Sequence, residues 1–125
     1  MGDDYAIEII EIHHDRKVDA PSGSALKIAE AVAKVLGRDF KKVGIYGRAG
    51  KEAGPRDSKE IGIHAIRGGN IPGEHTIMFI GKNEQLEIIH RVRDRSVFAQ
   101  GAIRAAEWVV EQKPGLYSMQ DILRV

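Results

Sequence analysis

A run of β-branched residues near the N-terminus constrains the fold more than any other feature of this sequence. Residues 5–12 read Tyr-Ala-Ile-Glu-Ile-Ile-Glu-Ile, which is apolar at nearly every position. Such a run is typical of a strand that is buried on most of both faces. A polar segment follows and ends at Pro21, which restricts Ala20 to an extended conformation. We therefore expect a central strand ending at Ile12, then a turn that leads to a helix.

The helix after this turn is expected over residues 25–36. Its apolar positions recur at the helical period and form one stripe, made by Ala25, Ile28, Ala29, Val32, Ala33 and Leu36. Ser22 and Ser24 are candidates for its N-cap, and Gly37 is a typical stop signal.

Three further strand-like runs cover residues 61–66, 75–80 and 86–92, and the short loops between them favour an antiparallel meander. Ser96 is expected to cap a second helix over residues 97–112, and Ser118 and Asp121 resemble a capping box for a short last helix. The segment 48–59 is polar and is expected to be mobile. The expected fold is α+β: a mixed open sheet of about four strands with two main helices and a short C-terminal helix.

Composition excludes several classes of protein. A length of 125 residues fits one domain, and 42% hydrophobic with 30% charged residues is ordinary for a globular protein. The net charge of +1 argues against nucleic acid or an anionic membrane as partner. Without cysteine the chain has no disulfides and no thiolate zinc site, and it has no apolar run near the roughly 20 residues that span a bilayer. With no signal-peptide pattern at the start, we expect a cytoplasmic setting.

His13 and His14 are the first candidate site. Neighbouring side chains on a strand point to opposite faces, so both can serve one site only if the backbone turns after Ile12. Lys17 can then fold back over the same place, and the helix start at Gly23 offers N–H groups that favour a carboxylate or phosphate. The alternative is a solvated turn followed by an ordinary serine cap. The histidine spacing lacks the HxxxH and HExxH patterns, so a zinc site is not expected.

Two other features leave their interpretation open. Arg91, Arg93 and Arg95 would share one face of a long enough strand, either as an anion-binding stripe or as a solvated face. The loop 67–75 has three glycines, which allow a ligand to approach or simply make a tight turn. The GxGxxG fingerprint of dinucleotide binding does not occur.

Five motifs in order resemble those of the dihydrodipicolinate reductase family. The first is EIHHDRKVDAPSGSA at 11–25, and the second is RGGNIPGEHT at 67–76. The others are LEIIHR at 86–91, FAQGA at 98–102 and GLYSMQDIL at 115–123. The resemblance covers nearly the whole chain but only the C-terminal half of such enzymes. It implies a substrate-binding and oligomerisation domain over residues 1–125, whose part 96–125 packs towards a nucleotide-binding domain outside this sequence.

The resemblance also implies roles for single residues. The family reduces 4-hydroxy-tetrahydrodipicolinate with NADPH or NADH in the diaminopimelate route to lysine. By position, His13 and Lys17 would be catalytic, as proton donor or acceptor and as partner cation. His14, Gly23 and Ser24 would bind a substrate carboxylate, although threonine is usual where Ser24 stands. The family forms homotetramers through the sheet.

These inferences lead to three hypotheses. The first is the substrate domain of the reductase, which alone binds neither cofactor tightly and does not catalyse. The second is a non-catalytic dicarboxylate-binding or scaffold module that acts with a separate nucleotide-binding chain. The third is an anion- or nucleic-acid-binding sheet that uses the arginine stripe, and the near-zero net charge and 6% aromatic residues disfavour it.

Overall fold

The computed structural model describes residues 4–123 and divides the chain into two compact units, one ending at Val92 and one beginning at Arg93. The strands of the first unit are β1 (Ala6–His13), β2 (Gly44–Tyr46), β3 (Ile61–Arg67), β4 (Glu74–Ile80) and β5 (Gln85–Arg91). Its helices are α1 (Gly23–Val35), α2 (Phe40–Val43) and the single turn η1 (Lys51–Ala53). The second unit holds α3 (Ser96–Val109) and α4 (Met119–Leu123).

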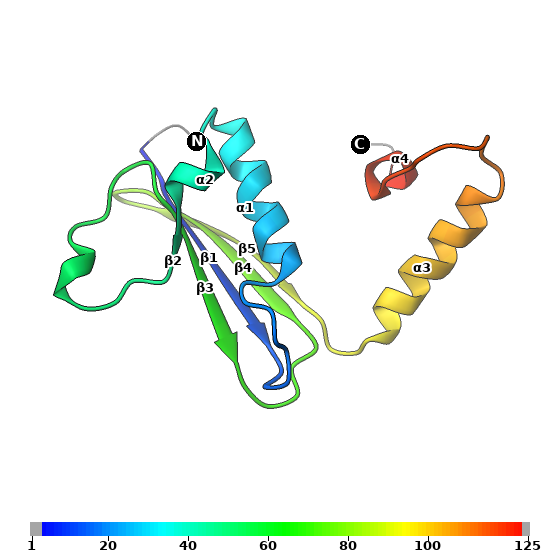
Figure 1. Cartoon of the computed structure of the whole chain (residues 1–125), viewed down its shortest axis with the longest axis horizontal. Helices are drawn as coiled ribbons and strands as arrows, with labels where there is room; N and C mark the ends of the chain where they lie inside the picture. The colour runs from blue at the N-terminus through cyan, green and yellow to red at the C-terminus, as the bar shows by residue number, and fades with distance from the viewer. Residues whose placement is uncertain (1–3, 124–125) are drawn as a thin grey trace. The chain divides into compact units, whose positions relative to one another are not determined.

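The strands of the first unit form one mixed sheet in the order β2-β3-β1-β4-β5, so the expected α+β class is confirmed (Figure 1). The short strand β2 adds to the four that the sequence indicated. The predicted meander is wrong at its first step, because β1 lies between β3 and β4 and pairs with both, parallel to β3 and antiparallel to β4. The most apolar strand takes the centre, where it buries the most surface. β4 and β5 do pair antiparallel as neighbours.

The core lies between this sheet and α1, which covers one face (Figure 1). Burial along β1 alternates, so the strand is fully buried on the helix face only and not on both faces as expected. Ile7 and Ile9 face α1, whose small residues Ala25 and Ala29 let the helix approach closely. Full burial of one isoleucine side chain stabilises the fold by about 1.5–3 kcal/mol.

The observed helix ends agree with the predicted capping and stop residues at some positions and differ from them at others. Ser22 is the N-cap of α1, with its hydroxyl accepting from the Ala25 N–H at 3.2 Å, whereas Ser24 lies within the first turn. Gly37 adopts φ +64° just after the helix, which confirms it as the stop. Ser96 is wrong as a cap: it is the first residue of α3, and its N–H donates to Asp94 Oδ1. The carboxylate of Asp94 reaches this amide because it is two residues upstream.

The second unit is a pair of helices with little interior. α3 ends at Val109, three residues before the predicted end, and buries none of its described residues. Trp108 and Tyr117 meet edge to face with ring centroids 5.1 Å apart. The predicted capping contact before α4 is present, since the Ser118 N–H donates to Asp121 Oδ2 at 2.6 Å. No helix among residues 4–123 is long and apolar enough to cross a membrane.

The loop between β2 and β3 is tied to the sheet. Arg56 donates to Glu8 Oε1 at 2.9 Å, and Arg48 forms an ion pair with Glu60. Glu8 also accepts from His64 Nε2 at 2.8 Å, which gives the sheet face away from α1 a carboxylate between a histidine and an arginine.

Candidate functional site

A buried carboxylate organises the C-terminal end of β1. Glu11 has no exposed surface, and Arg67 at the end of β3 grips it in a two-pronged ion pair, Nη1 to Oε2 and Nη2 to Oε1, each at 2.7 Å. The Ser22 N–H donates to Oε1 at 2.9 Å, and His13 Nδ1 lies 2.6 Å from Oε2. Each carboxylate oxygen therefore has two hydrogen-bond partners, which satisfies a buried anion.

These partners decide the charge of Glu11. Burial by itself raises the pKa of a carboxyl group, but the hydrogen bonds from Arg67, His13 and Ser22 outweigh it, so the pKa of Glu11 lies below its usual value. Glu11 is consequently ionised at neutral pH. The same contact raises the pKa of the Arg67 guanidinium, mainly through its hydrogen bonds to Glu11.

His13 lies between Glu11 and a second histidine. It is the last residue of β1 and is 9% exposed. Its ring meets the ring of His75 edge to face, with centroids 5.2 Å apart and planes at 74°. A Cβ atom at Gly73 would come to 3.0 Å from His13 Nε2, so glycine leaves that nitrogen its space.

His75 connects β4 to the start of α1. Its Nε2 lies 3.0 Å from the Ser22 hydroxyl, which also accepts the Ala25 N–H. Burial lowers the pKa of His75, and the nearby charge of His13 lowers it further. His75 is therefore neutral at pH 7, and its Nε2 and the Ser22 hydroxyl share one hydrogen bond in either tautomer of the ring.

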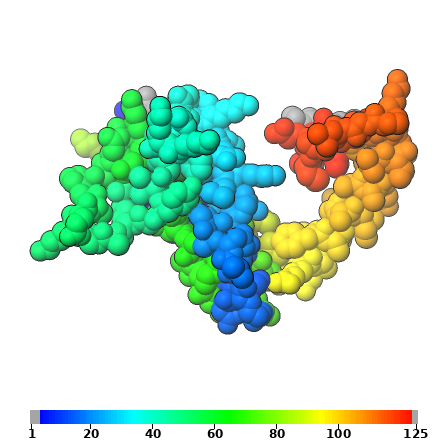
Figure 2. Space-filling model, in the orientation of Figure 1, coloured from blue at the N-terminus to red at the C-terminus, as the bar shows by residue number. Residues whose placement is uncertain are grey.

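The turn after β1 lies along the glycine loop between β3 and β4. The His14 N–H donates to the carbonyl of Ile71 at 2.9 Å, and the Gly68 N–H donates to the carbonyl of His13 at 3.0 Å. In Figure 2 the two segments are in contact, one blue and one green. The glycine loop thus supports the histidine turn.

Lys17 lies within this turn. Its N–H donates to the carbonyl of His14 at 3.1 Å, and its ammonium pairs with Asp19 at 2.8 Å. The hydrogen bond from Lys17 lowers the pKa of Asp19. Arg67 also donates to the carbonyl of Asp19, so the turn is fastened to β3 on the side of Lys17.

The structure places the predicted site residues at one end of the sheet. The Glu11 carboxylate connects His13 to Ser22, and Gly23 and Ser24 follow as the first two residues of α1, both exposed. The first turn of a helix presents N–H groups without partners inside the helix. The strand ends at His13 rather than at Ile12, because His13 still pairs with Arg67 across the sheet. His14 therefore lies just beyond the strand.

The three arginines do not form a stripe on one strand face, whereas the alternative of solvated side chains agrees with the exposure of all three. β5 ends at Arg91, which pairs with Glu74 at 3.1 Å, whereas Arg93 and Arg95 belong to the second unit. Val92 donates its N–H to Gly73, which ends the regular pairing before the other two arginines.

Sequence reasoning overlooked three members of the site: Glu11, Arg67 and His75. The alternation along β1 offered a signal, because Glu11 shares a strand face with Ile7, Ile9 and His13. A carboxylate on a buried face needs a cationic partner, and only the pairing of β1 with β3 identifies Arg67 as that partner.

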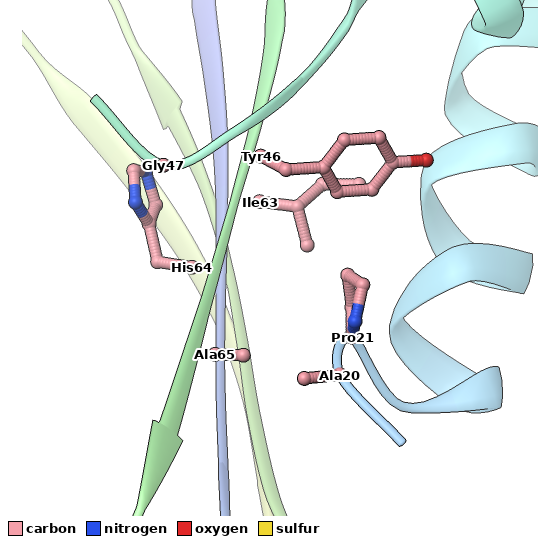
Figure 3. Close-up of a pocket in the computed structure, with 7 residues that line it drawn as sticks. All are labelled: Ala20, Pro21, Tyr46, Gly47, Ile63, His64 and Ala65. Atoms are coloured by element: carbon pink, nitrogen blue, oxygen red, sulfur yellow. The ribbon is translucent and has the colours of Figure 1, made fainter. Parts of the chain in front are cut away.

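A separate cavity of about 340 Å³ lies at the edge of the sheet beyond the end of β2 (Figure 3). Its walls are Ala20, Pro21, Tyr46, Gly47, Ile63, His64 and Ala65. In Figure 3 the His64 ring lies on the other side of β3 from Tyr46 and Pro21. None of the residues expected to act on a substrate lines this cavity, so it is distinct from the site at the end of β1.

The connection between β1 and α1 differs from that of a dinucleotide-binding fold. A dinucleotide fold has a short glycine-rich turn between its first strand and helix, so that backbone N–H groups reach the phosphates. Between β1 and α1 this chain instead has the histidine turn, with Lys17, Pro21 and the capping Ser22. Among residues 4–123, no cluster of three or more histidine or carboxylate side chains is arranged to hold a metal ion.

Comparison with known proteins agrees with this geometry. The family description "Dihydrodipicolinate reductase, C-terminus" matches residues 1–123. The chain belongs to the dihydrodipicolinate reductase family. It corresponds to the C-terminal domain of that family.

The relatives carry the name 4-hydroxy-tetrahydrodipicolinate reductase. The protein of Syntrophus aciditrophicus is 59% identical over 123 residues, and that of Geobacter sulfurreducens is 53% identical over the same length. Each match covers 98% of this chain and 46% of the relative, so the chain spans about half the length of these reductases.

Among solved structures, a dipicolinate-bound dihydrodipicolinate reductase from Paenisporosarcina sp. TG-14 is similar to this chain. The TM-score is 0.66 at 28% sequence identity, over 94% of this chain and 44% of that one.

Proposed function

We propose that a protein containing this chain reduces 4-hydroxy-tetrahydrodipicolinate with NADPH or NADH in the cytoplasm, in the diaminopimelate route to lysine. In this proposal the chain supplies the substrate pocket and the proton-transfer residues. The observation that carries it is the position of His13, held by a buried carboxylate beside the exposed start of α1. The membership of the family and the dipicolinate bound to the Paenisporosarcina relative support it.

The substrate of such a reductase is a dianion, and the site is suited to anions. Gly23 and Ser24 would bind one carboxylate through the first-turn N–H groups and the serine hydroxyl, with His14 beside them. The ammonium of Lys17 would exchange part of its ion pair with Asp19 for a contact with the second carboxylate of the ligand, because that carboxylate offers it the same charge-assisted hydrogen bond.

His13 is the proposed proton donor or acceptor. Addition of a hydride to a conjugated imine leaves negative charge on the reduced substrate, and a proton must neutralise that charge. Histidine exchanges protons near neutral pH, and the positive charge of Lys17 would stabilise the transition state electrostatically.

The 125 residues are proposed to be inactive without a nucleotide-binding part. The reduced nicotinamide ring supplies the hydride, and its cradle would have to lie outside this chain. We expect no oxidation of NADPH by the isolated chain above the rate of its Lys17→Ala variant. A clear excess over that variant would refute this part of the proposal.

Titration calorimetry with pyridine-2,6-dicarboxylate tests the pocket. We expect saturable binding by the chain and at least about tenfold weaker binding by Lys17→Ala, since a hydrogen bond to a charged group contributes about 1.5–3 kcal/mol. Lys82→Ala is the matched control, because Lys82 lies in the β4–β5 turn, away from the residues of the site. Equal weakening in both variants, or no binding by the folded chain, would contradict the assignment of the pocket.

We also propose that the chain assembles as a homotetramer through its sheet. The sheet face away from α1 has no helix over it in the first unit, and it includes Ile10, Met78 and the exposed Ile89. Apolar sheet surface of this kind is typical of an interface between copies. In the same proposal, the apolar side of α3 packs towards the nucleotide-binding part.

A further inference from the structure

Glu11 is absent from the residues proposed above to touch the substrate, yet it is the most buried charged group of the site. Its side chain is 0% exposed, and four hydrogen bonds from three elements converge on it. Burying a carboxylate is costly, and a buried ion pair often contributes little net stability. Its position beside His13 gives it a use in addition to stability.

An ionised carboxylate accepts hydrogen bonds and cannot donate them. Since Oε2 of Glu11 lies 2.6 Å from His13 Nδ1, that ring nitrogen must carry the hydrogen. In neutral His13 the lone pair is then on Nε2. The nitrogen that can exchange a proton with a ligand is therefore the one facing Gly73.

Arg67 holds the Glu11 carboxylate in this orientation towards His13. Its two-pronged contact uses both carboxylate oxygens, which prevents Glu11 from rotating away from His13. The Ser22 N–H also donates to Oε1, at 2.9 Å. Rotation of the carboxylate would break at least one of these bonds.

We propose that Glu11, held by Arg67, is a positioning residue that fixes the orientation and tautomer of His13, with hydrogen on Nδ1 and Nε2 presented for proton transfer. This inference rests on the proposed function for the meaning of the proton transfer. The tautomer itself is a property of the protein without ligand.

A second ion pair in the same sheet, centred on Glu8, provides a control for testing the role of Glu11. Glu8 lies on the same strand, on the opposite face, between Arg56 at 2.9 Å and His64 Nε2 at 2.8 Å. The types of partner are the same, but the histidine contact uses the other ring nitrogen. Glu8→Gln therefore disturbs a comparable ion pair without touching His13.

The test is ¹⁵N NMR of the histidine rings in the 125-residue chain at a pH where His13 is neutral. We expect the unaltered chain to show hydrogen on Nδ1 of His13, against the usual preference of histidine in water for Nε2. In Glu11→Gln, the amide oxygen can face Ser22 and its NH₂ group can face Nδ1, so the hydrogen should move to Nε2. The tautomer ratio should change by about tenfold or more, as loss of a charged hydrogen-bond partner implies. Glu8→Gln should leave it unchanged.

Two outcomes would overturn the inference: hydrogen on Nε2 in the unaltered chain, or a folded Glu11→Gln variant that keeps hydrogen on Nδ1. The first needs no variant, so the test holds even if Glu11→Gln does not fold. Pyridine-2,6-dicarboxylate added to the same samples reports on the proposed function separately. Binding with the wrong tautomer refutes only the role of Glu11, whereas the predicted tautomer without binding refutes only the proposed pocket.

Discussion

The Ser22 hydroxyl lies 3.0 Å from Nε2 of His75, and this contact joins the N-cap of α1 to strand β4. The first turn of α1 carries Gly23 and Ser24, the residues proposed to bind a carboxylate. The position of the helix start therefore depends on a histidine from a distant part of the sequence.

This contact predicts a pH dependence of stability. Burial keeps the pKa of His75 below the unfolded value of about 6.5, so between these two pKa values the unfolded state binds more protons. The free energy of unfolding should thus be highest above pH 6.5 and fall as the pH decreases below it. Urea unfolding at a series of pH values measures this. His75→Gln should flatten the dependence, whereas His90→Gln removes only a lesser charge that faces His75 from strand β5, so most of the dependence should remain.

The two serines at the start of α1 should separate stability from binding. Ser22→Ala removes the cap and the partner of His75, and should lower the free energy of unfolding by about 0.5–2 kcal/mol. Ser24→Ala changes an exposed residue and should leave stability within about 0.5 kcal/mol, while weakening binding of pyridine-2,6-dicarboxylate. Thermal unfolding and calorimetry on both variants check this. A similar loss of stability in both would contradict the assignment of Ser22 as the only cap.

Loss of Arg67 should be far more harmful than loss of an exposed arginine. Arg67→Met leaves Glu11 buried without its cation, which costs about 3–5 kcal/mol. Arg91→Met removes an ion pair with Glu74 at the surface and should cost about 0–1 kcal/mol. Denaturant midpoints of the two variants provide the comparison, and equal midpoints would show that Arg67 does not neutralise Glu11.

Gly73 should tolerate no side chain. In Gly73→Ala the new methyl group would lie 3.0 Å from His13 Nε2, so we expect a loss of about 1–3 kcal/mol from crowding and weaker binding of the dicarboxylate. Gly68→Ala is the matched control in the same loop, because a Cβ atom there meets nothing within 4 Å. Unimpaired binding in a stable Gly73→Ala variant would mean that Nε2 does not face the ligand.

The proposed assembly can be tested on the sheet. Ile89→Lys places a charge on the face away from α1 and should shift the chain from tetramer to smaller species in sedimentation analysis. Val18→Lys changes a residue that is 97% exposed in the turn after β1 and should have no effect. A chain that is monomeric before any substitution would refute the proposed tetramer.

Local sequence was a good guide wherever one element alone decides the outcome. The apolar run at 5–12, the stripe of α1 and the glycine at position 37 each correspond to an observed feature. Periodicity and turn chemistry act over a few residues, so they can be read without the fold. Ser96 failed as a cap because the helix begins at Ser96 itself, whose N–H donates to the carboxylate of Asp94 two residues upstream, and residue types alone do not rank the two candidates.

The order of the strands in the sheet could not be predicted from local sequence patterns. Short loops favoured β3 and β4 as neighbours, but β1 lies between them because the most apolar strand gains most from the centre of the sheet. The same change in order places Arg67 of β3 and His75 of β4 on either side of β1.

By itself, the sequence determined the class of fold, the helix that carries Gly23 and Ser24, and the motifs that led to the family. Only the tertiary structure decided that Glu11 is the centre of the site. Its partners Ser22 and Arg67 are 11 and 56 residues away along the chain. Contacts over such separations depend on strand pairing and burial, and neither is encoded in the spacing of residues within one segment.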